Sequence, residues 1–149
     1  MKGSYFLVIR LENKKTIMTK GRSFELAPGY YVYVGSAMNS LEKRVERHFR
    51  KTKKLHWHID FLLSEAELLR AYLIPSRERL EERLSVEVSR KGEPVEGFGA
   101  SDVSVKTNLY RFEEEPDPLL RDILQKFNLG WKLLKVDGEI NGVGEKNED

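Results

Sequence analysis

Hydrophobic residues along the chain follow two different spacings, and the first third of the sequence has the spacing of strands. A dense apolar run at residues 4–11 is followed by four polar residues, which predicts a strand and a turn. Two short segments on either side of Gly21 predict a hairpin. A further turn is expected at Pro28 and Gly29, and residues 30–35 predict the next long strand.

Tyrosine and valine alternate in this second long strand. Tyr31 and Tyr33 would share one face, while Val32 and Val34 would share the other, and the strand stops at Gly35. Because tyrosine is a good strand residue, a purely structural role in the core is one interpretation. The alternative is that one tyrosine on this face is a reacting group.

From Leu41 onward the apolar spacing changes to three and four residues, which is typical of a helix. Ser40 stands just before this stretch and is a suitable N-terminal cap. Residues 55–63 are compatible with either a strand or a helix, and residues 67–75 return to a strand pattern that ends at a proline.

The remaining sequence predicts a second helix capped by Ser76, with Leu80, Leu84 and Val88 on its buried side. A glycine-rich loop, a late strand and a short amphipathic helix follow at residues 96–102, 103–112 and 117–127. The order of elements predicts an α+β (mixed α/β) fold, in which a small central, mainly antiparallel sheet is flanked by helices.

Composition limits the domain organisation and the chemistry. The chain has 149 residues, enough for one domain with a core, and we expect that domain at residues 1–135. Residues 136–149 lack apolar periodicity, which predicts a flexible tail. The absence of cysteine excludes disulfides, thiolate catalysis and cysteine zinc sites. With no signal-peptide pattern and no apolar run near the roughly 20 residues that span a bilayer, we expect a cytoplasmic protein without membrane attachment.

Charge is nearly balanced overall, at a net +2, but it is unevenly distributed. Between Lys43 and Lys54 stand seven Lys or Arg residues and one acid, Glu46. Such a block is typical of a surface that faces phosphates, although a solvated helix face has the same composition. The residues expected to contact nucleic acid are Lys43, Arg47, Arg50, Lys51, Lys53 and Lys54.

Two tyrosine motifs and one helix supply candidate catalytic groups. Gly3-Ser4-Tyr5 opens the first strand, and Tyr33-Val34-Gly35 ends the second long strand. Arg44 and His48 are four residues apart on the predicted helix, so they share a face. This ordered set resembles the GIY-YIG nuclease family, in which two tyrosine motifs lie on neighbouring strands and the next helix bears an arginine.

A subfamily of unknown function within that family is the closer resemblance, and some of its members are fused to a DNA-repair glycosylase. The resemblance covers residues 3–112, about three quarters of the chain. The stretches that carry it are GYYVYVGSA, LEKRVERHFR, KLHWHIDFLL, RLEERL and GFGASD.

The resemblance implies roles at the matching positions. Tyr5 and Tyr33 match the two motif tyrosines, and Arg44 matches the helix arginine. His48 falls where many members have a histidine or a tyrosine. Arg44 would clamp a phosphate, and Tyr33 would act as general base, with Tyr5 as its hydrogen-bonding partner or as the alternate base. The structural alternatives are core tyrosines and a surface arginine that forms salt bridges.

The resemblance also implies one divalent metal ion, Mg²⁺ or Mn²⁺, held by a glutamate on a later helix. Glu81 fits best, Glu78 and Glu82 are rivals, and an ordinary solvated glutamate is the alternative. Two features depart from the family pattern. Ser36 replaces a usual lysine, and the 27 residues between Tyr5 and Tyr33 require an extra hairpin.

Residues 56–60, with the sequence HWHID, form a second candidate site. If they are extended, His56, His58 and Asp60 point one way and resemble a metal-ligand or proton-shuttle array. If they are helical, His56 and Asp60 share a face and His58 turns away. A tryptophan-anchored core segment with mutually hydrogen-bonded polar groups is the structural alternative.

The glycine-rich loop ends in Ser101 and Asp102, and its backbone amides could cradle a phosphate. A tight structural loop is the other interpretation.

These patterns predict a metal-dependent DNA endonuclease that hydrolyses phosphodiester bonds in DNA repair or processing. The rival prediction is a catalytically inactive module of the same fold that binds nucleic acid or holds a repair partner. The expected partners are accordingly DNA and a DNA-repair protein.

Overall fold

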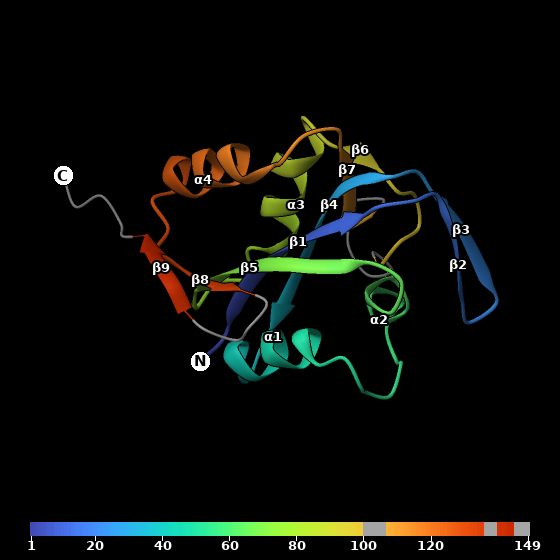
Figure 1. Ribbon diagram of the computed structural model, residues 1–149. Coiled ribbons are helices and arrows are strands. Elements are labelled where there is room, and N and C mark those ends of the chain that lie inside the picture. Colours follow the sequence, from blue (N-terminus) through green and yellow to red (C-terminus); the bar gives the residue numbers. More distant parts are fainter. Residues whose placement is uncertain (100–106, 136–139, 145–149) are drawn as a thin grey trace.

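A seven-stranded antiparallel sheet forms the centre of the protein, in the order β6-β7-β4-β1-β5-β8-β9. The computed structural model describes residues 1–99, 107–135 and 140–144 (Figure 1). The strands are β1 (Gly3–Leu11), β2 (Lys15–Thr19), β3 (Arg22–Leu26), β4 (Gly29–Ala37), β5 (Glu67–Pro75), β6 (Glu93–Pro94), β7 (Leu109–Phe112), β8 (Trp131–Lys135) and β9 (Ile140–Gly144). The helices are α1 (Leu41–Phe49), α2 (His58–Leu63), α3 (Glu81–Ser89) and α4 (Asp117–Lys126). The predicted α+β fold with a mainly antiparallel sheet is confirmed.

Helices cover both faces of this sheet, with α1 and α2 on one side and α3 and α4 on the other (Figure 1). Strand β1 lies in the middle and is buried on both faces, which explains its nearly continuous apolar sequence. Tyr5 and Leu7 face the core beneath α1 and α2, whereas Phe6 and Val8 face the core beneath α3 and α4. The sheet therefore separates two apolar cores.

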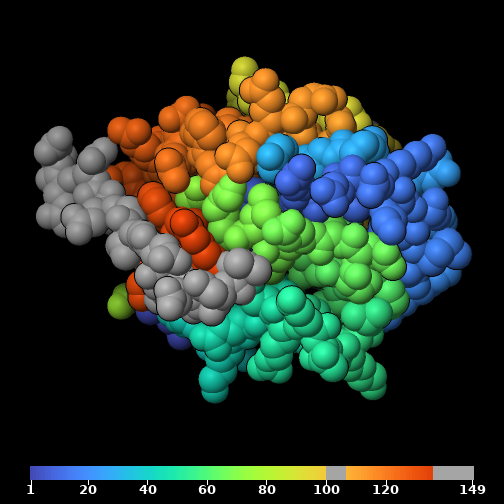
Figure 2. All heavy atoms as spheres, in the orientation of Figure 1, coloured from blue at the N-terminus to red at the C-terminus, as the bar shows by residue number. Residues whose placement is uncertain are grey.

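The extra hairpin expected between the two tyrosine motifs is confirmed as β2 and β3, which pair only with each other in the described part of the chain. This hairpin lies at one end of the domain, beyond the end of β1 and the start of β4 (Figures 1 and 2). Ile17 and Phe24 anchor it to the core beneath α1 and α2.

Local signals predicted most elements, and one capping prediction was wrong. Ser40 caps α1 as expected, since its side chain accepts a hydrogen bond from the backbone of Lys43. Ser76 does not cap α3, which begins only at Glu81. The Ser76 hydroxyl instead accepts from the backbone N–H of Glu78 and closes a turn before the helix.

Three short strands, β6, β8 and β9, were not predicted, because none of them has an alternating apolar pattern. Residues 136–139 and 145–149 of the predicted tail lie outside the described residues. Between them, β9 pairs with β8 through backbone hydrogen bonds, which require no apolar periodicity. None of the helices in the described ranges is long and apolar enough to cross a bilayer.

Candidate active site

Strand register brings the first tyrosine motif against the second. Tyr5 on β1 lies directly opposite Gly35 on β4, and Leu7 lies opposite Tyr33. A methyl group at position 35 would lie 2.3 Å from Cζ of Tyr5, so the tyrosine ring occupies the space that any side chain there would need. Tyr33 is the diagonal neighbour on the same face, with its ring centroid 6.4 Å from that of Tyr5.

Helix α1 adds a histidine to this tyrosine pair. Leu41, Val45 and His48 form its buried side, at the spacing of one helical face. Nε2 of His48 lies 2.8 Å from the hydroxyl oxygen of Tyr5. The side chain of His48 is fully enclosed, and Nδ1 has no hydrogen-bond partner among the described residues.

Arg44 lies one turn before His48, at the rim of the same side of α1. It donates from Nη1 to the backbone carbonyl of Ser36 at 3.2 Å, just beyond the second tyrosine motif. Its guanidinium also lies over the indole of Trp57, 4.7 Å from the ring centroid. These two contacts direct the arginine toward the end of β4.

Asp60 has a structural role, which decides between the two interpretations of the HWHID segment. Residues 58–63 are helical, and the buried Asp60 carboxylate accepts from Arg47 at 2.8 and 3.0 Å and from the backbone of His56 and Trp57. These bonds cap the start of α2 and hold Trp57 in place. Burial acts to raise the pKa of Asp60, but the bonds from Arg47 and the two backbone groups together lower that pKa to about 2.

Among the described residues, the two histidines of the same segment have bonding partners other than the tyrosine pair. His58 hydrogen-bonds through Nδ1 to the hydroxyl of Thr19 and packs against Phe24 and Phe98. Burial and the charge of Arg22 lower its pKa. His56 is exposed. Among the described residues, no group of three His, Asp or Glu side chains could hold a metal ion, and Ser101 and Asp102 lie outside those residues.

Glu81 reaches the site from the first turn of α3. Its Oε2 accepts a hydrogen bond of 3.2 Å from Nδ2 of Asn108, which also donates to the backbone carbonyl of Gly99. Asn108 was not predicted as a site residue. The one feature of the sequence that could have pointed to Asn108 is its place beside a buried strand, where a polar amide needs hydrogen-bond partners.

All five residues predicted as catalytic or metal-binding line one cavity of about 230 Å³. These are Tyr5, Tyr33, Arg44, His48 and Glu81. Gly35, Ser36, Trp57 and Asn108 complete much of its wall. The structure thus gathers one carboxylate, one guanidinium, one imidazole and two phenols around a small polar space.

Burial keeps the two phenols and the imidazole of this cavity neutral. It raises the pKa of Tyr5 and of Tyr33 well above the usual value for a phenol. Tyr33 raises the pKa of Tyr5 further, Glu81 raises the pKa of both phenols, and Arg44 lowers both pKa values. Burial also lowers the pKa of His48 to about 3, so the imidazole is neutral at pH 7.

The donor set fits a single hard cation. Mg²⁺ and Mn²⁺ prefer oxygen ligands, and Mg²⁺ commonly binds through one or two carboxylates together with water and substrate phosphate. Glu81 supplies one carboxylate, and Oδ1 of the neighbouring Asn108 is a buried amide oxygen without a hydrogen-bond partner in the described part of the chain. Both are ligands of the required type.

The block of basic residues divides into exposed and internally bonded members. Lys43, Arg50, Lys51 and Lys54 are exposed. Arg47 is paired with Asp60, and Lys53 donates to the backbone carbonyls of His48 and Arg50 at the end of α1. Two of the six residues predicted to contact phosphates therefore also have a structural function.

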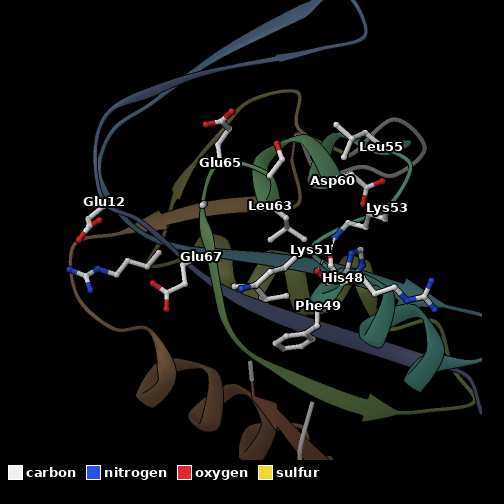
Figure 3. Close-up of a pocket in the computed structure, with 15 residues that line it drawn as sticks. Glu12, His48, Phe49, Lys51, Lys53, Leu55, Asp60, Leu63, Glu65 and Glu67 are labelled. Atoms are coloured by element: carbon white, nitrogen blue, oxygen red, sulfur yellow. Dashed lines mark hydrogen bonds between the residues drawn. The ribbon is translucent and has the colours of Figure 1, made fainter. Parts of the chain in front are cut away.

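A larger cavity of about 500 Å³ lies beside the same helix and also touches His48 (Figure 3). Lys51 and Lys53 line it, but so do the acids Glu12, Glu65 and Glu67 (Figure 3). Its mixed charge, and a described lining that contains neither Tyr5 nor Tyr33, make it a poorer phosphate site than the smaller cavity.

The fold and cavity together define an α+β domain with a compact tyrosine, arginine, histidine and glutamate site at its sheet. The chain belongs to the family described as domain of unknown function DUF123, whose model matches residues 4–129. Comparison with curated proteins and with solved structures found no match.

Proposed function

We propose that the protein is a metal-dependent DNA endonuclease of the GIY-YIG type, acting in DNA repair or processing in the cytoplasm. The observation that carries the proposal is the convergence of Tyr5, Tyr33, Arg44, His48 and Glu81 on one cavity of about 230 Å³. These residues come from β1, β4, α1 and α3, and a shared structural role would not require them to meet around an open space.

Arg44 is suited to bind the scissile phosphate. A guanidinium can donate two parallel hydrogen bonds to phosphate oxygens, which a lysine ammonium cannot match in geometry. In the present structure Ser36 and Trp57 already orient it. Binding a phosphodiester at this position would place the phosphorus beside the two phenols.

The phenols and His48 are suited to accept the proton of the attacking water. The water oxygen forms its bond to phosphorus while the bond from phosphorus to the 3′-oxygen breaks, and the water proton moves to a phenolic oxygen. If the Tyr5 hydroxyl donates to the neutral Nε2 of His48, the phenolic oxygen can take the water proton while its own proton passes to Nε2. Tyr33 is the alternative base.

Positive charge is needed for this base role, because burial opposes a phenolate at either tyrosine. Arg44 provides part of it. A divalent ion, when bound, would supply the rest and would stabilise negative charge on the phosphoryl and leaving oxygens. Glu81 is the residue that would hold it, with Asn108 fixing the carboxylate through Oε2.

The second candidate function is a nucleic-acid-binding module of the same fold. Its support is the high pKa of both tyrosines together with the single carboxylate among the described lining residues of the cavity, since both features weaken catalysis unless a metal binds. Such a module could instead serve as the docking platform of a repair protein.

Nicking of supercoiled plasmid in the presence of Mn²⁺ or Mg²⁺ tests the proposal. We expect wild-type protein to nick, and Arg44→Ala and Glu81→Gln to lose about 100-fold or more of the rate. Glu82→Gln is the matched control, because it removes the same charge one residue further along α3 and should leave the rate nearly unchanged. Equal nicking by all variants, or none by wild type with either metal, would contradict the endonuclease and leave the binding module.

A further inference from the structure

A second cavity, which we call the flanking cavity, opens next to the candidate active site. Its volume is about 410 Å³, and it shares Tyr33, Trp57 and Gly99 with the active-site cavity. The remaining lining residues are Lys20, Arg22, His56, His58 and Gly97. A ligand that occupies the active site can therefore continue into this space without leaving the protein surface.

The wall of the flanking cavity is cationic and aromatic. None of its described lining residues is an aspartate or a glutamate, whereas the 500 Å³ cavity beside α1 has several acids in its wall. Lys20 and Arg22 contribute full positive charges, and His56 and Trp57 contribute rings whose centroids lie 5.2 Å apart at an interplanar angle of 62°. Cations beside aromatic rings match a ligand that has both phosphate and a base.

The two cations come from the hairpin that separates the tyrosine motifs. Lys20 occupies its tip, in a left-handed conformation with φ of 40°, and Arg22 begins β3. The Arg22 guanidinium donates to the carbonyl of Gly97 at 3.4 Å and lies over the ring of Phe24 at 5.1 Å. A side chain at position 97 would collide with it, since a methyl group there would lie 2.5 Å from Nη2.

These contacts hold Arg22 in place while leaving most of its hydrogen-bonding capacity. A guanidinium has five N–H donors, and within the described residues the carbonyl of Gly97 accepts from one of them. An arginine that is oriented in advance loses less conformational freedom when it binds a phosphate. The hairpin is thus organised to present charge, in addition to covering the core.

We propose that the flanking cavity binds the nucleotide adjacent to the scissile phosphate, with Lys20 and Arg22 on its phosphate and His56 and Trp57 against its unstacked base. The inference rests on the proposed function for the identity of the neighbouring phosphate. The substrate class that it specifies is a single-stranded or locally unpaired strand, because a base stacked within a duplex cannot reach these rings. The extra hairpin is then a substrate-binding element.

Binding measured in EDTA tests the flanking cavity separately from cleavage. All proteins in this experiment carry the substitution Trp131→Phe, so that Trp57 is their only tryptophan and its fluorescence reports binding. The ligand is an oligothymidylate of about eight nucleotides. We expect binding to quench Trp57 emission. Lys20→Ala/Arg22→Ala should weaken binding about tenfold and reduce the salt slope of log K by about 1.4, from 0.7 per phosphate contact.

Lys14→Ala/Lys15→Ala is the matched control, because it removes two positive charges at the opposite, base end of the same hairpin. We expect it to change affinity less than about twofold. Equal affinities for the two double variants would overturn the proposal. His56→Ala should cost about fivefold with oligothymidylate but not with an abasic strand of equal charge. Equal losses of affinity with both strands would show that His56 does not contact a base.

Hydrolysis of bis(p-nitrophenyl) phosphate with Mn²⁺ separates the two proposals. This small diester does not reach the flanking cavity, so Lys20→Ala/Arg22→Ala should hydrolyse it at the wild-type rate. If no variant hydrolyses it but the binding difference persists, the endonuclease fails and the nucleotide site stands. If hydrolysis is normal and the binding difference is absent, the nucleotide site fails alone.

Discussion

The hydroxyl oxygen of Tyr5 lies 2.8 Å from Nε2 of His48, although 43 positions separate the two residues in the chain. Both side chains are almost completely enclosed, at 2% exposure each. A polar pair that is withdrawn from water at this depth is costly unless its members satisfy each other. The bond therefore links the central strand to α1, while burial keeps the imidazole neutral.

Neutral His48 predicts a specific dependence of stability on pH. Its pKa is about 3 in the folded protein and near 6.5 in the unfolded chain, so the unfolded chain binds more protons between these values. The stabilising contribution is complete above about pH 6.5 and is lost as pH falls toward 3, by up to about 1.4 kcal/mol for each pH unit. Urea unfolding at pH 7 and pH 5 measures it.

His48→Gln is the control. Its free energy of unfolding should lack the pH dependence that His48 causes and should keep the part that other titratable groups cause. The histidine ring signal that is missing from the variant's NMR spectrum identifies His48. That signal should not titrate above about pH 4, and a titration midpoint near 6.5 would contradict the buried neutral imidazole.

Gly35→Ala should displace the Tyr5 ring. The added methyl group would lie 2.3 Å from Cζ and 2.4 Å from the hydroxyl oxygen of Tyr5, which no rotation at position 35 relieves. Overpacking of this kind costs about 1–3 kcal/mol of the free energy of unfolding. Denaturant unfolding would measure that loss, and nicking should fall with it. A variant with wild-type stability and activity would show that the ring can move freely.

Asp60→Asn should destabilise the protein without touching the catalytic groups directly. Loss of the charge weakens two bonds from Arg47, which is itself partly exposed, and we expect a cost of about 2–4 kcal/mol at pH 7. The folded pKa of Asp60 is depressed to about 2, so its contribution is present above about pH 4 and lost as pH falls toward 2. The free energies of unfolding of wild type and Asp60→Asn should therefore become equal as pH falls through that range, which denaturant unfolding at several pH values measures.

Arg44→Lys tests the geometry of the arginine rather than its charge. Lysine keeps the positive charge but loses the planar fork and weakens the contact with the Trp57 indole. We expect nicking to fall about tenfold or more while DNA affinity changes little. Arg50→Lys, at the exposed end of α1, is the matched control. Full activity of Arg44→Lys would show that charge alone suffices.

Lys43→Ala/Lys51→Ala/Lys54→Ala tests the exposed part of the basic block. If the three side chains contact phosphates of duplex DNA, the slope of log K against log salt should decrease by about 2.7, from 0.9 per contact. Lys53→Ala, which removes bonds to backbone carbonyls at the end of α1, should instead cost about 0.5–1 kcal/mol of stability. An unchanged salt slope in the triple variant would show that duplex DNA binds to a different surface of the protein.

Local sequence signals predicted the strands β1 to β5, the hairpin and the helix α1. They succeeded because apolar periodicity, turn residues and caps act within a few positions of the chain. They failed at Ser76, because a hydroxyl can close a turn as readily as it can cap a helix. The resemblance to a nuclease family supplied the five site residues, but sequence spacing alone could not show that Glu81 meets Tyr33.

The sequence by itself determined most of the longer strands and helices and their apolar faces, since these properties follow from neighbouring residues. Only the tertiary structure decided that Tyr5 stands opposite Gly35 and that Asn108 holds Glu81. It also decided that Arg47 and Lys53 are bonded internally and that the extra hairpin brings Lys20 and Arg22 beside the site. These relationships depend on strand register and on packing between distant segments, where a shift of one residue would turn each side chain to the opposite face.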